Sequence, residues 1–166
     1  MPSPQRPNQR WSMDFVTDSI VTGRRFRALA IVDDYSRECP VIEVDTSLGG
    51  VRVVSVLERL AETRGLPNVI TMDNGPEFAR RALDEWAYRR GVKLNFIRPV
   101  KPIDNAYAES FIGRLRDECL NKNWFMNLKH ARDIIEDWRR DYNEFRPHSS
   151  LKGKAPMEYA VTATGL

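Results

Sequence analysis

The stretch "NVITMDNGPEF", from Asn68 to Phe78, joins an apolar run to an abrupt polar end. Its first part suits a short buried strand, and Asp73 then precedes Asn74-Gly75-Pro76, a combination typical of turns. Asp73 can simply begin that turn, because Asp is an ordinary turn residue. It can equally be one carboxylate of a metal site at the end of a strand. The rest of the chain has to decide between these interpretations.

The composition fits one compact domain. The chain has 166 residues, of which 42% are hydrophobic, which is enough for a core. No apolar run reaches the roughly 18 residues of a membrane helix, and the Pro-rich start lacks the apolar stretch of a signal peptide, so we expect a cytoplasmic protein. We expect a flexible leader over residues 1–10, a core over 11–151 and a C-terminal tail over 152–166, with irregular structure after Arg146. Cys39 and Cys119 indicate two buried thiols.

The basic residues are more informative than the net charge of +3, since 20 of the 26 are arginine. The planar guanidinium group of arginine matches phosphate oxygens, whereas lysine is a point charge. This bias is compatible with a nucleic-acid partner. A solvated surface with ordinary helix salt bridges explains it as well.

The periodicity of apolar residues predicts strands first and alternation afterwards. Expected strands cover residues 10–16, 39–44, 68–72 and 92–97, with a second strand within 23–37 that ends near Asp33; expected helices cover 49–65, 77–91 and 128–142, and a further helix begins near Ala106. This order predicts an α/β fold in which a mixed five-stranded sheet is flanked by helices. An antiparallel meander should form one side, and crossover helices should join the parallel strands.

Three acidic residues fall where such a fold can gather them. Asp14 lies on the strand face opposite Trp11 and Met13, Asp73 ends the fourth strand, and Glu109 begins a helix. If strands one and four are neighbours, the two aspartates lie side by side and a helix packed across the sheet can add Glu109. Clustered carboxylates repel one another unless cations lie between them, and oxygen ligands suit Mg²⁺ or Mn²⁺. The alternative is three unrelated acids among the 23 of the chain.

The chain resembles the catalytic core of bacterial insertion-sequence transposases, an Asp-Asp-Glu family that shares the retroviral integrase core. The resemblance rests on "RWSMDFV", "FRALAIVDDYSRECPVIEV", "DNGPEF", "KPIDNAYAESF", "GRLRDECLN" and "YNEFRPHSSL", which together span Arg10 to Leu151. Between Asp73 and Glu109 lie 35 residues, positions 74–108, the separation typical of this family.

The resemblance implies a ribonuclease H-like fold and a DNA transposase that cleaves a phosphodiester and transfers the freed 3′-OH to a second one. It implies that Asp14, Asp73 and Glu109 hold two Mg²⁺ or Mn²⁺ ions, which is consistent with two-metal chemistry at phosphodiesters. Element ends and target DNA are the implied partners, and we expect a homo-oligomer when assembled on DNA. Relatives carry an N-terminal helix-turn-helix part, which this chain lacks. A plain nuclease and a non-catalytic DNA-binding or assembly remnant of a transposase remain alternatives.

Four residues are candidate DNA contacts. Arg116 occupies the basic position that the family has seven residues after Glu109, nearly two turns along the same helix face. Gly113 lies between them, where a missing side chain lets DNA approach the backbone. Lys101 precedes this helix and is a candidate phosphate contact. His148, in "RPHSSL", either meets DNA or packs the C-terminal end of the domain.

Two positions depart from the family pattern. Val100 stands where the family usually has glycine, and Ile112 replaces a polar residue three positions after Glu109 that can serve as a site or DNA contact. Either change can lower activity. For the remaining motifs we expect Asp33-Asp34 to form a turn and Trp124-Phe125 to anchor the core.

Overall fold

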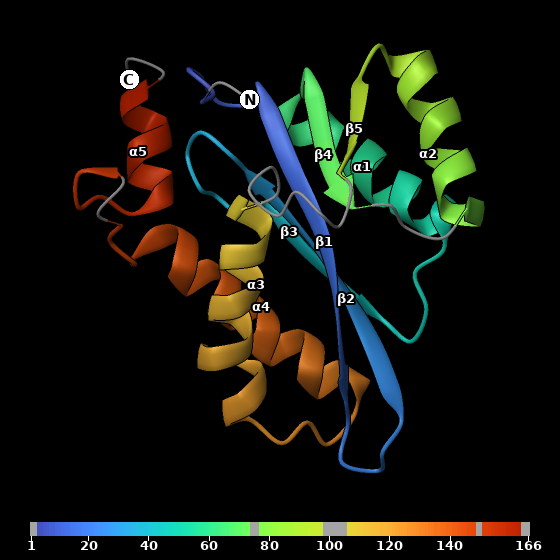
Figure 1. Cartoon of the computed structure of the whole chain (residues 1–166). Coiled ribbons are helices and arrows are strands. Elements are labelled where there is room, and N and C mark those ends of the chain that lie inside the picture. Colours follow the sequence, from blue (N-terminus) through green and yellow to red (C-terminus); the bar gives the residue numbers. More distant parts are fainter. Residues whose placement is uncertain (1–2, 74–76, 98–105, 149–150, 164–166) are drawn as a thin grey trace.

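The computed structural model describes residues 3–73, 77–97, 106–148 and 151–163, and a five-stranded sheet forms its centre (Figure 1). The sheet order is β3-β2-β1-β4-β5. Its strands are β1 (Arg10–Ser19), β2 (Arg25–Asp33), β3 (Val41–Asp45), β4 (Val69–Asp73) and β5 (Lys93–Ile97). The first three form an antiparallel meander, and β4 and β5 run parallel to β1. The predicted mixed sheet is confirmed, and strands one and four are neighbours, which meets the condition for the two aspartates to lie side by side.

Helices cover both faces of this sheet. They are α1 (Gly50–Arg64) and α2 (Glu77–Arg90) on one face, α3 (Ala106–Glu118) and α4 (Leu128–Glu144) on the other, the short 3₁₀ helix η2 (Leu120–Lys122), and α5 (Pro156–Ala163). Within the described residues no helix is both long and apolar enough to cross a bilayer.

The last helix, α5, contradicts the prediction of an irregular tail after Arg146. Pro156 begins it, and proline is well suited to a first helical turn because its missing N–H is not needed there. The Glu158 carboxylate also accepts the backbone N–H of Ala155 at 3.2 Å, which satisfies a donor at the helix start. Local capping therefore defines a helix whose apolar periodicity is weak.

Strand alternation divides the apolar residues between two cores. The core under α1 and α2 takes Trp11 and Met13 from β1, and the core under α3 and α4 takes Val16. Successive side chains of a strand point to opposite faces, so Asp14 shares a face with Val16. The acid predicted to be catalytic therefore faces the layer that carries Glu109.

The end of the predicted leader is fixed to the domain rather than loose. The backbone N–H of Asn8 donates to Asp33 Oδ2 at 2.8 Å, and its side-chain amide donates to the carbonyl of Arg64 at 2.5 Å. The indole N–H of Trp11 donates to Asn8 Oδ1 at 3.0 Å. Asn8 thus connects the start of β1 to the end of β2 and to α1.

Of the two aromatic residues that follow η2, only one packs in the core. Phe125 is buried and meets the Phe26 ring edge-on, with 5.7 Å between ring centroids. Trp124 is 82% exposed, so its prediction as a core residue was wrong. The backbone is extended here, at Asn123, and neighbouring side chains of an extended segment point in opposite directions. Cys39 and Cys119 are free and buried, as predicted.

Candidate active site

Asp14 and Asp73 lie at the same level of two adjacent parallel strands. The register pairs Met13 of β1 with Met72 of β4, and the next residue along each strand is one of the two aspartates. Asp73 is the last residue of β4 and its side chain is exposed. Asp14 is half-buried, and one of its oxygens accepts the backbone N–H of Phe15 at 2.8 Å. The strand order thus brings the two aspartates together, as the sequence predicts.

Glu109 comes to the aspartates on α3. This helix lies across the face that β1 and β2 share (Figure 1), and it packs there through its buried residues Phe111, Ile112 and Leu115. Glu109 is in the first turn and is exposed. Because α3 packs on this face of the sheet through its apolar residues, Glu109 lies on the same face.

The electrostatics of Asp14 link all three acids. The pKa of Asp14 is raised from 3.8 to about 6; burial is the largest cause, and the charges of Asp73 and Glu109 add to the rise. The Phe15 N–H and, more weakly, the Arg116 guanidinium act in the opposite direction. The structure thus brings Asp14, Asp73, Glu109 and Arg116 into one electrostatic neighbourhood.

These carboxylates have the chemistry of a site for hard cations, although they do not close around one. None of the ion pairs between described residues involves Asp14, Asp73 or Glu109. Among those same residues, no three His, Cys, Asp or Glu side chains form a group that could hold a metal ion. Negative oxygens without a protein cation beside them are the ligands that Mg²⁺ and Mn²⁺ prefer.

The other predicted site residues on α3 have distinct surroundings. Arg116 is exposed in the last turn, and a Cβ added at Gly113 would meet nothing within 4 Å, so this face of the helix is open. Ile112 is buried in the core between α3, α4 and the sheet, which makes it a packing residue and not a DNA contact. Lys101 and Val100 lie outside the described residues.

A buried polar network beside the acids was not found by sequence reasoning. Asp34 is 1% exposed and accepts from Arg10 Nε at 2.5 Å and from Ser12 Oγ at 2.7 Å. Burial raises the pKa of Asp34, and these two donors oppose that rise. Arg10, Ser12 and Asp14 alternate along β1, and this polar face of an otherwise apolar strand was the available indication.

The turn after β2 reaches the start of α3. Asp33 accepts the backbone N–H of Tyr35 at 2.9 Å, which confirms its predicted turn role. Arg37, in the same connection, places its guanidinium 3.7 Å from the centroid of the Tyr107 ring. Tyr107 precedes Glu109 by two residues, so the β2–β3 connection helps to position the helix that carries the third acid.

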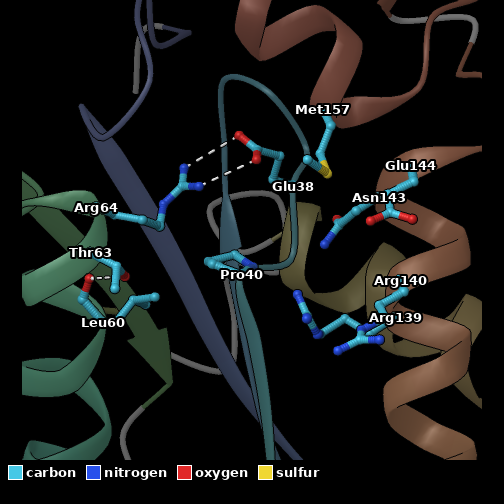
Figure 2. A pocket seen from close by; sticks show the side chains of 10 residues that line it. All are labelled: Glu38, Pro40, Leu60, Thr63, Arg64, Arg139, Arg140, Asn143, Glu144 and Met157. Carbon is cyan, nitrogen blue, oxygen red and sulfur yellow. Dashed lines mark hydrogen bonds and ion pairs between the residues drawn. The ribbon is translucent and has the colours of Figure 1, made fainter.

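Elsewhere a cavity of about 320 Å³ lies between α1, the β2–β3 connection, α4 and α5 (Figure 2). Arg64 of α1 pairs with Glu38 of the β2–β3 connection at 3.3 Å, and Arg139 pairs with Glu136 of its own helix at 2.7 Å. None of the three predicted acids lines it, so this hollow is not the candidate reaction site.

Comparison with known proteins supplies the family. Two family descriptions, each of an integrase core domain, match residues 4–102 and 90–156. The chain belongs to the integrase core domain family. An uncharacterized protein of insertion element IS407 from Burkholderia multivorans is 52% identical over 158 residues, which are 95% of this chain and 57% of that protein. The putative transposase InsK of insertion sequence element IS150 from Escherichia coli K12 is 28% identical over 93% of this chain and 55% of its own length.

This integrase core chain spans about half the length of the curated relatives it matches. Among solved structures, the intasome of simian T-cell lymphotropic virus gives a TM-score of 0.81 at 16% identity, over 96% of this chain and 56% of that one. The integrase catalytic core domain of HTLV-2 in complex with magnesium gives 0.73 at 17% identity, over 93% and 97%. At these identities the likeness shows the fold, and it confirms the predicted ribonuclease H-like architecture.

Proposed function

We propose that this integrase core is the catalytic part of a DNA transposase, which cleaves a phosphodiester at an element end and transfers the freed 3′-OH to target DNA. The observation that carries the proposal is the half-buried Asp14 carboxylate, whose pKa the charges of Asp73 and Glu109 raise. Asp14 and Asp73 come from neighbouring strands, and Glu109 comes from a helix packed on the same face of the sheet as Asp14. The insertion-element names of the relatives support the same function.

Asp14, Asp73 and Glu109 are the ligands we assign to two Mg²⁺ or Mn²⁺ ions. Their mutual repulsion and their oxygen chemistry suit hard divalent cations. The magnesium in the HTLV-2 integrase core supports the choice of metal. When bound, such ions supply activation of the attacking oxygen and stabilisation of the leaving one at a phosphodiester.

The protein residues themselves have binding and orienting roles. The Phe15 N–H fixes one oxygen of Asp14 and leaves the other available as a ligand. Asp73, at the end of β4, presents its carboxylate to solvent, from which DNA must approach. Arg116 holds a phosphate beside the acids, and Gly113 leaves room for the backbone of the nucleic acid. Neither chemical step needs a covalent protein intermediate, so no nucleophilic side chain is assigned.

Lys101 and His148 remain proposed as further DNA contacts. The active form we propose is a homo-oligomer on DNA; the solved relatives include an intasome and trimeric and dimeric forms of an integrase core. A cytoplasmic location follows from the proposal, because the relatives are bacterial and bacterial DNA lies in that compartment.

The test is a cleavage and joining assay on linear and branched DNA with Mg²⁺ or Mn²⁺ and a labelled 3′-OH donor. Asp73→Asn and Glu109→Gln should each reduce both products by about 10³-fold or more, since each removes a ligand of the reacting centre. Asp117→Asn, an exposed change on the same helix as Glu109, is the control and should retain activity. Cleavage without joining would identify a nuclease, and DNA binding without either product would identify a non-catalytic remnant.

A further inference from the structure

A second, smaller cavity lies against the first turns of α3. Its volume is about 90 Å³, and its polar lining comes from Arg37 in the β2–β3 connection, from Ser110 and Arg114 on α3, and from His148 after α4. Tyr107 and Tyr142 contribute aromatic walls. Ser110 directly follows Glu109, so the cavity shares a helix with the proposed active site.

The lining of this cavity is cationic. Among the described residues, it contains two arginines, a histidine and no carboxylate. Between described residues neither Arg37 nor Arg114 forms an ion pair with an acid. Arg37 instead lies over the Tyr107 ring and donates to the carbonyl of Asp34. Two guanidinium groups thus line this cavity without a counter-charge from the part of the chain that the structure describes, in contrast to the Arg64–Glu38 pair of the larger cavity.

His148 adds a buried donor that has no acceptor. Its side chain is among the buried polar groups, at 7% exposure, and its Nδ1 lies 3.3 Å from Arg114 Nη1. Arginine can only donate, so Nδ1 is the acceptor and the neutral ring carries its proton on Nε2. Within the described residues Nε2 is buried and has no hydrogen-bond partner. A buried N–H without an acceptor is unfavourable, so a ligand that brings an acceptor to this lining residue would gain a hydrogen bond that the described residues do not supply.

The ring is held in place before any ligand arrives. The backbone N–H of His148 donates to the carbonyl of Lys154 at 3.0 Å, and the ring meets Tyr142 edge-on with 5.0 Å between centroids. The Tyr142 hydroxyl donates to the carbonyl of Arg37 at 2.8 Å. Arg37 has a φ of 66°, a left-handed conformation that residues other than glycine seldom adopt. Burial, together with Arg114, Arg37 and Arg146, lowers the pKa of His148 to about 4, so the ring is neutral near pH 7.

We propose that this cavity binds one phosphate group, with the guanidinium groups of Arg37 and Arg114 and the His148 Nε2–H as its donors. A phosphate supplies charge-assisted acceptors for all three, and a cavity of about 90 Å³ has room for roughly three waters or one small tetrahedral anion. The group comes from the backbone of bound DNA or from free phosphate. The DNA assignment rests on the proposed function. If the phosphate belongs to DNA, α3 fixes the distance between this phosphate and Glu109. The pocket then sets the position along the DNA strand at which the three acids act.

The experiment titrates inorganic phosphate at constant ionic strength into isotope-labelled protein and follows the histidine ring nitrogens by NMR. The chain has only two histidines, so His130, which does not line the cavity, is an internal control. The His148 Nε2 resonance should shift and saturate while that of His130 stays fixed. Arg114→Gln should weaken phosphate binding by about tenfold or more, because it removes a charged donor. The matched control Arg59→Gln, on α1 and paired with Glu43, removes the same charge elsewhere and should leave the affinity unchanged.

His148→Phe keeps the ring against Tyr142 and removes both nitrogens, so it should abolish binding while the protein stays folded. A second titration uses duplex DNA in place of phosphate. A shift of His148 with both ligands, and a salt slope lower by about 0.9 in Arg114→Gln, identifies the DNA backbone as the source. A shift with inorganic phosphate alone identifies free phosphate.

An unmoved His148 in both titrations would overturn the proposal. So would equal phosphate affinity of folded Arg114→Gln and the unsubstituted protein. Failure of the proposed function would look different, because the phosphate titration involves neither metal nor catalysis. A chain that neither cuts nor joins DNA but still binds phosphate at His148 would contradict the transposase assignment and retain the pocket.

Discussion

Asp14→Asn should stabilise the metal-free protein by an amount that grows between about pH 4 and pH 6 and reaches its full value above about pH 6. The side-chain amide keeps the size of the carboxylate and an oxygen that can accept the Phe15 N–H, but it removes the charge. The pKa of Asp14 is raised from 3.8 to about 6, chiefly by burial. Between these values the folded protein binds a proton that the unfolded chain has lost, so the free energy of unfolding falls as the pH rises through this window and stays low above it.

The expected gain in the free energy of unfolding follows from the size of the Asp14 pKa shift. A rise from 3.8 to about 6 corresponds to about 3 kcal/mol, and screening of a half-exposed carboxylate reduces it to about 1.5 kcal/mol. Asp14→Asn should therefore melt about 3–6 °C above the unsubstituted protein at pH 8, and at the same temperature at pH 4, where both side chains are neutral. The measurement is thermal unfolding in EDTA from pH 4 to pH 8.

Asp18→Asn is the matched control for this experiment. Asp18 lies on the same strand and face and likewise accepts the N–H of the next residue at 2.8 Å, but it is four residues, or about 13 Å, from Asp14. The difference in melting temperature between Asp18→Asn and the unsubstituted protein should not grow between pH 4 and pH 6. The reasoning is refuted if the difference between Asp14→Asn and the unsubstituted protein is the same at pH 4 and pH 8, or if the variant is less stable at pH 8.

Substitutions at three further positions test neighbouring parts of the structure. Mg²⁺ or Mn²⁺ should raise the melting temperature of the protein by mass action and raise that of Asp73→Asn less; equal shifts would place the ions elsewhere. Arg116→Ala should lower the salt slope of duplex DNA binding by about 0.9, and Arg116→Lys should restore the slope more fully than the catalytic rate; an unchanged slope with a lower melting temperature would make Arg116 structural. Asp34→Ala should lower the free energy of unfolding in urea by about 3 kcal/mol, because it takes a carboxylate from the buried Arg10; a loss below about 1 kcal/mol would mean that the pair behaves as if exposed.

Local periodicity predicted part of the frame of the site. The alternation in β1 separates Asp14 from Trp11 and Met13, whereas the pairing of β1 with β4, which brings Asp73 beside it, joins segments far apart in the chain and was only a condition of the sequence analysis. The spacing of apolar residues on α3 likewise indicates which side of the helix packs, and hence where Glu109 stands. The roles of the three acids came from the family resemblance and remain proposals.

Contacts between distant polar residues were beyond the sequence. The pair of Arg10 with Asp34 and that of Arg114 with His148 each depend on how two elements meet in space, and nothing in either local pattern selects the partner. Trp124 was misplaced for a related reason, because the direction of a side chain in an extended connection depends on where the chain leaves η2. The helix α5 was missed since its start is defined by a cap and not by a strong apolar stripe.

β1 precedes the other strands of the sheet in the chain, yet it lies at the centre of the sheet. It can pair with β2 at once, but the apolar face these strands share is covered only by α3 and α4, whose last residue is Glu144. While most of the chain is being translated, this face and the unpaired edge of β1 remain exposed. Such surfaces favour association between nascent chains. The same order means that Glu109 joins the two aspartates late. A chain interrupted before α3 would lack both the cover of its core and the third acid, so we expect the assembly of the catalytic centre to depend on near-complete synthesis of the domain.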